Sequence, residues 1–308
     1  MVATLLILLT LLTVVFLAVW VAAVLDQGRH GPASPAGERG WPPLEHHAIG
    51  FVTNFFDTLG IGSFAPTTAI YRLRRLVPDD LIPGTLNVGH TPPVVTQALI
   101  YIVIIAVDPW TLVLLISAAV GGAFFGAGVV AGLSRRRIQI GMGLALLAAA
   151  GLMVMTQFGW FPAGGDTLGL TGAPLVIGLV GSAVMGALMT LGVGFYAPCM
   201  IMISLLGMNP KAAFPIMMGA CAFLMPVAGM RFVRKGRYSL RAALGLAMAG
   251  IPGVLLAAYI VRSLELGTVR WLVVAVVLYT AVSMLGAAFR TPAPAAAAAA
   301  RTAGEQEG

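Results

Sequence analysis

The chain has 308 residues, of which 59% are hydrophobic and 9% are charged, and its mean hydropathy is +0.96. Soluble domains carry about 25% charged residues, so this composition excludes an ordinary soluble protein and is typical of an integral membrane protein. The formal charge of +7 does not indicate a nucleic-acid partner, because the basic residues lie in short loops between apolar segments, where they set orientation in the bilayer.

The first apolar segment, residues 1–25, is expected to be a retained transmembrane helix. It has no basic n-region, and its apolar run exceeds the roughly 7–15 residues typical of a signal peptide. A run of this length can cross a bilayer as a helix. Residues 26–47, which are rich in Gly, Pro and charge, are expected to form a polar loop.

Residues 48–158 are expected to form the first of two transporter repeats. Their opening segment contains the motif TLGIGSFAP at 58–66, which is followed by NVGHTPP at 87–93 and then by two plain apolar helices separated by SRRR. Glycine, serine and proline weaken the interior of a helix. The first motif therefore predicts a helix break at membrane depth.

A second repeat is expected at 174–289, after a loop at 159–173. The motif returns as TLGVGFYAP at 190–198, and an ungapped offset of 132 residues aligns the two halves. Nine of the 26 positions from 58 to 83 are identical to their counterparts, and several of these are helix-breaking positions. Chance similarity between apolar helices would not match such positions, so the pattern indicates an internal duplication. The low-complexity residues 290–308 are expected to be a disordered tail.

The Lys and Arg residues favour motif segments that enter the membrane and return to the same side. If both segments crossed the bilayer, the 18 basic residues would divide equally between its two sides. If both fold back at their glycines, 15 of the 18 share one side, as the positive-inside rule requires.

The predicted fold is therefore an all-α integral membrane protein with about 7 full transmembrane helices and two glycine-broken re-entrant hairpins. Each repeat makes an odd number of crossings, so the two repeats are inverted relative to each other. The rule also predicts a multi-pass protein of the inner (cytoplasmic) membrane, with its N-terminus outside and its C-terminal tail in the cytoplasm.

The two breaks are expected to form the substrate site, because matching interrupted segments in two halves mark the binding site of inverted-repeat transporters. Each break would be followed by a returning half-helix with a proline in its first turn. Its free N–H groups and positive dipole end suit an anion. The expected substrate-binding residues are Thr58, Gly60, Gly62, Ser63, Asn87, His90, Thr190, Gly192, Gly194, Phe195 and Tyr196, with Pro66 and Pro198 in structural roles.

Asp57 and His90 are ionisable residues at apparent membrane depth, where a charge is costly and such residues are functional candidates. Their counterparts in the second half are Met189 and Ala222. This asymmetry is consistent with ion coupling by Asp57 and His90 in one half only. The alternatives are that Asp57 caps a helix and that His90 is a neutral, hydrogen-bonded side chain.

Two further alternatives concern small residues. The motif glycines could serve close helix packing instead of binding. Cys199 and Cys221 have no CxxC or metal-ligand spacing, so both are expected to behave as small hydrophobes. No metal, cofactor or catalytic residue is expected.

In the two duplicated motifs the chain resembles the sulfite exporter TauE/SafE-like family, also described as the toluenesulfonate uptake permease (TSUP) family, from about residue 45 to 290. The resemblance implies a permease for sulfite, organosulfonates and related sulfur-containing anions. It implies that the signature positions are Gly60, Gly62 and Pro66 with Gly192, Gly194 and Pro198. Family members commonly carry a longer glycine run where this chain has Ser63 and Phe64, and bulkier residues change the size of the pocket.

The function expected from the sequence is a secondary transporter of a small, sulfur-containing anion, and no enzymatic activity is expected. The chain has no Walker A motif, so ATP hydrolysis is not expected. One alternative is a non-transporting subunit that assists the assembly of a membrane complex. Another is an intramembrane hydrolase that uses Ser63 and His90, although GIGS is not a GxSG motif. The identity of the anion, the direction of transport, ion coupling and homo-oligomerisation stay open.

Overall fold

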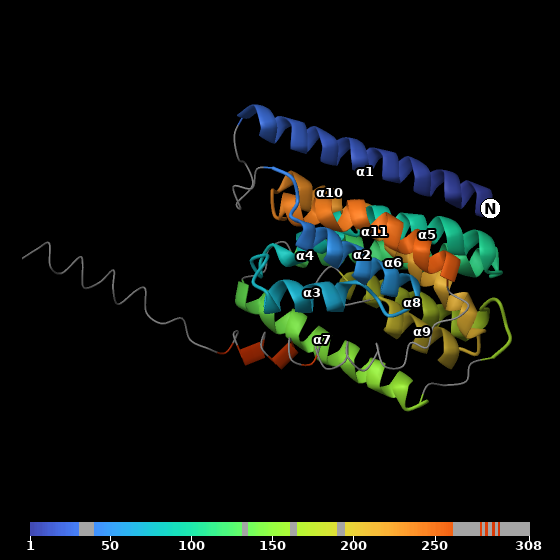
Figure 1. The fold of residues 1–308 in the computed structure, drawn as a ribbon. Coiled ribbons are helices and arrows are strands. Elements are labelled where there is room, and N and C mark those ends of the chain that lie inside the picture. The colour runs from blue at the N-terminus through green and yellow to red at the C-terminus, as the bar shows by residue number, and fades with distance from the viewer. Residues whose placement is uncertain are drawn as a thin grey trace, which may run out of the picture.

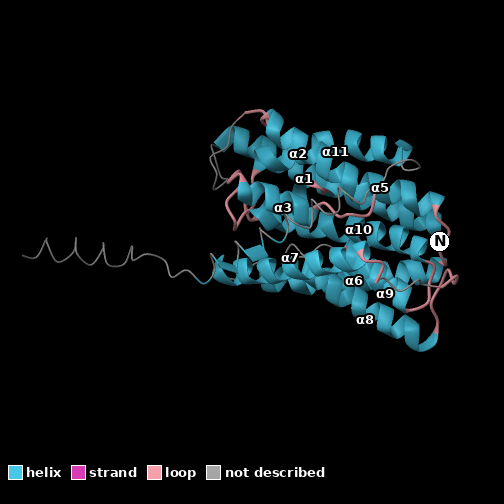
Figure 2. Cartoon of the chain, turned by 60° about the horizontal axis from the view of Figure 1, so that its bottom comes forward, coloured by secondary structure: helices cyan, strands magenta, loops and turns pink. Residues whose placement is uncertain are grey.

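The computed structural model describes residues 1–30, 40–130, 135–160, 165–189 and 195–260, together with six helical positions between 278 and 289. Within these residues the chain is helical, and its only β feature is an isolated bridge between Thr167 and Met208 (Figure 2). Five of the described helices are long and apolar enough to cross a membrane, and the apolar helix Thr91–Ile104 is shorter. The prediction of an all-α membrane protein is confirmed.

In chain order the described helices are α1 (Val2–His30), α2 (Leu44–Thr58), α3 (Phe64–Leu73), α4 (Ile82–Gly89), α5 (Thr91–Ile104), α6 (Pro109–Val130), α7 (Arg135–Gln157), α8 (Gly172–Met189), α9 (Tyr196–Leu205), the 3-10 helix η1 (Pro210–Ala212), α10 (Ala213–Arg234) and α11 (Leu240–Ile260). Helix α1 continues beyond residue 25 and α2 begins before residue 48, so the segment between them is shorter than the expected loop at 26–47. Figure 1 shows α1 along one side of the bundle and α7 along the other.

The first broken segment is a hairpin of α2 and α3, called hairpin 1. Gly60 and Gly62, between the two helices, have φ angles of +86° and +89°, which side-chain-bearing residues rarely adopt. A carboxylate oxygen of Glu45, in the first turn of α2, lies 2.9 Å from a guanidinium nitrogen of Arg74, directly after α3. The chain therefore turns back at its glycines, and both ends of hairpin 1 lie together.

The second broken segment, hairpin 2, consists of α8 and α9, and it also has both ends together. The backbone N–H of Asn209 donates to the carbonyl of Thr167 at 2.9 Å, and the N–H of Gly165 donates to the carbonyl of Met208 at 3.1 Å. These residues precede α8 and follow α9. Residues 190–194, at the turn, lie outside the described part of the chain. Although α8 alone is long enough to span a membrane, its continuation into α9 returns to the starting side.

The returning helices of the two hairpins have matching local geometry. Phe64–Leu73 and Tyr196–Leu205 are the same ten positions at the offset of 132 residues, and the same pattern of backbone hydrogen bonds closes both. The equivalent residues Arg75 and Gly207 follow, with φ angles of +53° and +80°. The halves thus share backbone conformation as well as sequence.

Each hairpin packs its first helix along a helix of the other half. Helix α2 lies along α11, and α8 lies along α6, where α6 and α11 are equivalent at the offset of 132 residues. Small residues allow the close approach. A Cβ atom added at Gly50 would lie 2.7 Å from the Cα of Leu246, and one added at Gly122 would lie 1.8 Å from the carbonyl oxygen of Ala183.

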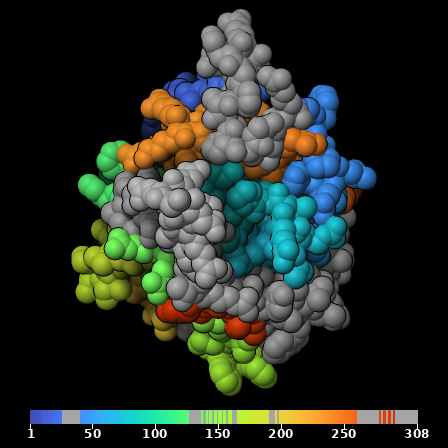
Figure 3. Space-filling model, turned by 90° about the vertical axis from the view of Figure 1, so that its left-hand side faces the viewer, coloured from blue at the N-terminus to red at the C-terminus, as the bar shows by residue number. Residues whose placement is uncertain are grey.

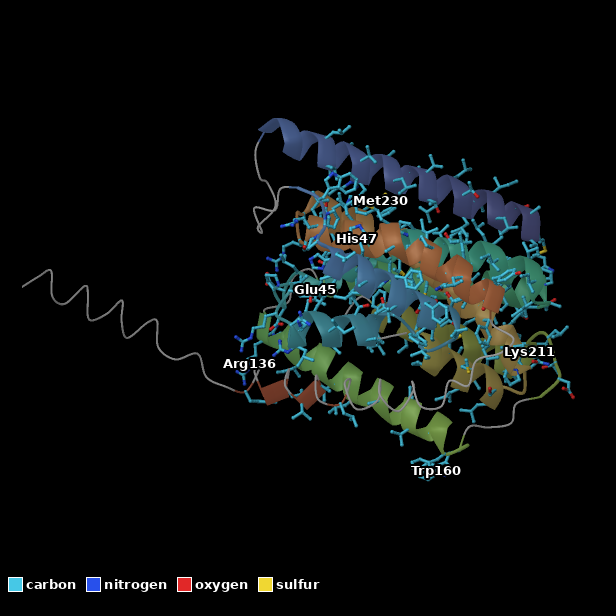
Figure 4. The ribbon with its side chains drawn as sticks, in the orientation of Figure 1. Glu45, His47, Arg136, Trp160, Lys211 and Met230 are labelled. Carbon is cyan, nitrogen blue, oxygen red and sulfur yellow. The ribbon has the colours of Figure 1, made fainter. Side chains whose placement is uncertain are left out.

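Most of the described basic side chains gather at one end of the bundle, called the basic end. There a guanidinium nitrogen of Arg237 lies 3.9 Å from a carboxylate oxygen of Asp80. Figure 4 shows Glu45 and Arg136 at this end and Lys211 at the opposite, or Lys211, end. In the space-filling view of the basic end (Figure 3), the blue-to-teal surface of hairpin 1 and α4 lies below the orange surface of α10 and α11.

Helix α10 is the central helix of the bundle. Most of its residues are buried, and it contacts α1, α4, α5, α6 and α9. All eight residues of α4 are buried as well. The backbone runs almost without interruption from α4 into α5, since the N–H of His90 donates to Leu86 and its carbonyl accepts from Val94. The returning helix α3 of hairpin 1 packs against α4, and the returning helix α9 of hairpin 2 packs against α10.

Candidate functional site

A small cavity lies between the turn of hairpin 1 and the described residues on either side of the turn of hairpin 2. Its volume is about 30 Å³, enough for roughly two water molecules. Both hairpins contribute to its wall, and α5 and α10 complete it. The lining residues are Asp57 and 61–65 from hairpin 1, Met189, Phe195, Tyr196 and Pro198 from hairpin 2, Val94 from α5, and Cys221 and Met225 from α10. The structure thus brings the two motif regions together around one space.

The two motif glycines of hairpin 1 do not serve helix packing. A Cβ atom added at Gly62 would meet nothing within 4 Å, because Gly62 faces the cavity. One added at Gly60 would lie 3.3 Å from the ring of Phe214, a side chain and not the backbone of a neighbouring helix. Close packing of helices depends instead on other glycines, such as Gly50 and Gly122. The motif glycines provide the turn and leave room beside it.

Asp57 is a buried carboxylate in the cavity wall, held entirely by neutral donors. Its Oδ2 accepts a hydrogen bond from Nε2 of Gln97 at 2.8 Å and lies 3.2 Å from the hydroxyl oxygen of Tyr196. The hydroxyl and backbone N–H of Ser63 also lie near the carboxylate. Ser63 is the N-cap residue of α3, so Asp57 places its carboxylate at the positive end of that helix. Among the described residues that line the cavity there is no Lys or Arg.

Gln97 is the principal site residue that sequence reasoning missed. It is fully buried on α5, where Nε2 also lies 3.0 Å from Oγ1 of Thr58 and Oε1 accepts from the hydroxyl of Tyr196 at 2.8 Å. An amide within the apolar helix 91–104 is a signal that could have found it, because polar side chains at membrane depth need partners.

Tyr196 joins the two halves at the cavity. It is the first residue of α9, in hairpin 2, and its hydroxyl reaches Asp57 and Gln97, both in the first half. It is 5% exposed. The wall on the α10 side is apolar and sulfur-rich, with Sγ of Cys221 lying 3.6 Å from Sδ of Met189.

His90 lies behind hairpin 1 and does not line the cavity. Its Nδ1 is 3.0 Å from Oδ1 of Asn54, and its Nε2 is 3.1 Å from Oγ1 of Thr67. The Asn54 amide nitrogen donates to the carbonyl of Gly50, so the Asn54 oxygen accepts and Nδ1 of His90 carries a hydrogen. His90 thereby connects α2 and α3 to the α4–α5 junction.

The other predicted residues line the cavity, lie away from it, or fall outside the described part of the chain. Ser63, Phe195, Tyr196 and Pro198 line the cavity, while Thr58 lies behind Asp57, bonded through Oγ1 to the carbonyl of Asn54 and through its own carbonyl to Tyr101. Pro66, like Pro198, is in the first turn of its returning helix. Asn87 lies away from the cavity, and its side-chain nitrogen donates within α4 to the carbonyl of Pro83. Thr190, Gly192 and Gly194 lie outside the described residues.

Cys199 and Cys221 are both buried and unpaired as disulfides. Their surroundings are those of small hydrophobic side chains, with Cys199 in α9 and Cys221 in α10. Within the described residues, no group of three or more His, Cys, Asp or Glu side chains could hold a metal ion.

No known family model, curated protein or solved structure matches the chain. The assignment of function therefore depends on the cavity and the helices that form it. Membership of the sulfite exporter family stays a prediction from the resemblance of the two motifs.

Proposed function

We propose that the chain is a secondary transporter for a small anion, which binds in the cavity between the two hairpin turns. The observation that carries this proposal is the cavity itself, lined by the first helix break and by residues that flank the second, in an all-helical membrane fold. Non-helical backbone at membrane depth is tolerated where it is buried in protein or lines a cavity. A binding site between two such breaks is a recurrent arrangement in transporters.

The two halves would act as inverted repeats that move relative to each other. Reciprocal packing supports this, because the first helix of each hairpin lies along the other half. The full crossings would be α1, the α4–α5 pair, α6, α7, α10, α11 and a last helix after residue 260, about seven in all. Their number within each repeat is odd, which inverts the second repeat.

Neutral donors would bind the anion. In the described chain the backbone N–H groups of Gly62, Phe64 and Ala65 have no hydrogen-bond acceptor, and all three residues line the cavity. They lie at the positive end of α3, where an anion is stabilised by about 0.3–1 kcal/mol at an exposed site and by more in a buried one. The hydroxyls of Ser63 and Tyr196 add two further polar groups.

The substrate we propose is a sulfur-containing anion such as sulfite or an organosulfonate, following the resemblance to the TauE/SafE-like family. The cavity has room for roughly two water molecules, which is less than a sulfonate needs. Entry of a sulfonate would therefore require the two hairpins to separate. Rocking of one repeat against the other would open the site to each side in turn.

The proposed location is the cytoplasmic membrane, with the basic end inside. Fifteen of the 18 Lys and Arg residues belong to the loops and tail assigned to that side, and such loops are retained in the cytoplasm. This orientation places the N-terminus outside and the C-terminal tail in the cytoplasm.

Transport by the purified protein in liposomes tests the proposal. We expect saturable uptake of labelled sulfite, methanesulfonate or taurine into protein-containing liposomes and none into empty liposomes. The protein should also exchange internal for external substrate of the same kind. If no anion in such a panel is taken up or exchanged by protein that is folded and inserted, the proposal is wrong, and a role as an assembly subunit gains support.

A further inference from the structure

We propose that the cavity binds the anion together with a proton, which is carried by Asp57, so that transport of the anion is coupled to transport of a proton. This inference rests on the proposed anion transport and names the ion that drives it. It follows from the number of hydrogens available around Asp57 and from the charges that face the cavity.

Asp57, Gln97 and Tyr196 form a closed triangle of three polar contacts. The distances are 2.8 Å from Asp57 to Gln97, 2.8 Å from Gln97 to Tyr196 and 3.2 Å from Tyr196 to Asp57. Each contact needs one hydrogen. The Gln97 amide supplies one to the triangle and the Tyr196 hydroxyl supplies another.

An ionised Asp57 would leave one of the three contacts without a hydrogen. If the Gln97 amide is oriented as in the structure, the single hydroxyl hydrogen of Tyr196 faces two acceptors, Gln97 and Asp57, and one of these two contacts is left as a pair of facing oxygens. If the amide is reversed, the two oxygens that face each other belong to Asp57 and Gln97. In both orientations a proton on the carboxyl group supplies the missing hydrogen, so the triangle has a place for one proton.

An ionised Asp57 would also compete with the substrate anion. The carboxylate lies near the backbone N–H and hydroxyl of Ser63, at the same end of α3 that would hold the anion. Two negative charges a few ångströms apart at low dielectric repel each other strongly. Protonation of Asp57 removes this repulsion and converts an acceptor-only group into a donor that can face the anion.

No other described group near Asp57 can supply the compensating positive charge. The titratable groups that face it are Tyr196 on α9, Tyr101 on α5 and Cys221 on α10, and none of these side chains carries a positive charge in any protonation state. His90 is a buried base, but its ring nitrogens contact Asn54 and Thr67 instead. The proton must therefore reside on Asp57 itself.

The resulting cycle conserves charge and atoms. A proton from one aqueous phase binds the Asp57 carboxylate, the monoanion binds beside it, and both leave into the other phase after the hairpins rearrange. One proton and one monovalent anion cross together, so the step is electroneutral. At equilibrium a difference of one pH unit would then support about a tenfold concentration ratio of the anion.

The test uses the full-length protein in liposomes with labelled methanesulfonate, whose own charge does not change in the relevant pH range. We expect acidic external medium to drive accumulation of about tenfold per pH unit, and a luminal pH indicator to record one proton entering per anion. If wild-type protein exchanges methanesulfonate but moves no protons, this inference is wrong while the proposed function stands. If wild-type protein exchanges none of the panel anions, the proposed function itself fails.

A variant identifies the proton carrier. Asp57→Asn supplies the third hydrogen of the triangle permanently and cannot release it. We expect this variant to lose pH-driven accumulation while keeping a slower methanesulfonate exchange that is the same at pH 6 and pH 8. The matched control is Asp166→Asn, an exposed carboxylate outside the cavity, which should respond to the gradient as wild type does. Gradient-driven accumulation that persists in Asp57→Asn would overturn the assignment to Asp57.

Discussion

Gly62 combines two properties that no other residue type can supply at that position. Its φ of +89° would cost a residue with a Cβ roughly 1–2 kcal/mol, and its missing side chain leaves the cavity open. The neighbouring Ser63 then directs its N–H and hydroxyl to Asp57. The position of the Ser63 N–H and hydroxyl beside Asp57 therefore depends on the backbone turn that Gly62 adopts.

The first prediction concerns Gly62→Leu. The added side chain would extend into a cavity of about 30 Å³ and fill it, so we expect transport to fall below detection while membrane insertion is retained. Gly159→Leu is the matched control, because Gly159 also has a positive φ, of +67°, and has nothing within 4 Å of an added Cβ. Near-normal liposome uptake by Gly62→Leu would contradict the placement of the substrate.

The second prediction separates the role of His90 from that of Asp57. Removing the imidazole by His90→Ala leaves Oδ1 of Asn54 and Oγ1 of Thr67 without their partner, and each loss costs about 1–3 kcal/mol in a buried site. We expect a lower thermal unfolding temperature in detergent and a pH profile of transport with the wild-type shape. A shifted pH profile would instead assign ion coupling to His90.

Among the structural elements, hairpin 1 is held by helix packing more than by its ion pair. Glu45 and Arg74 meet at 2.9 Å, but their side chains are 35% and 64% exposed, and such pairs contribute about 0–1 kcal/mol. By contrast, α2 lies along α11 so closely that Gly50 has no room for a Cβ. Close packing of this kind is the main source of attraction between helices within a bilayer.

The third prediction compares these two contributions directly. Arg74→Ala should change the free energy of unfolding by less than about 1 kcal/mol. Gly50→Leu should destabilise the protein by about 1–3 kcal/mol or more, since the added side chain would push α2 away from α11. Thermal unfolding in detergent, with transport measured in parallel, distinguishes them. A larger loss in Arg74→Ala would show that the ion pair holds the hairpin.

The whole molecule has two chemically different ends. The basic end carries Arg74, Arg136 and Arg237, whereas Lys211 lies at the opposite end (Figure 4). This asymmetry exists only because each hairpin returns to its starting side. This charge distribution favours the proposed orientation, in which the basic end faces the cytoplasm.

The fourth prediction tests that orientation by cysteine labelling. In a background with the buried Cys199 and Cys221 replaced by alanine, Lys211→Cys should react with a membrane-impermeant maleimide in intact cells. Glu45→Cys and Arg75→Cys should react only after permeabilisation. If positions 45 and 75 are labelled from opposite sides, hairpin 1 crosses the membrane and the inverted-repeat arrangement is wrong.

The sequence by itself determined the duplication, the positions of both helix breaks and the common side of the hairpin ends. These features are readable because glycine and proline act locally on the backbone and because basic residues can be counted loop by loop. The matching bounds of α3 and α9 follow from the same repeated residues.

Only the tertiary structure decided which polar side chains share the cavity. Asp57, Gln97 and Tyr196 are 40 to 139 residues apart in the chain, and their meeting depends on how α5 and α9 are rotated about their axes. In the sequence His90 and Asp57 looked equivalent, as ionisable residues in apolar segments. The packing of α4 against hairpin 1 directs His90 to Asn54 and Thr67 and leaves Asp57 at the cavity, because each position on a helix points its side chain in a fixed direction about the axis.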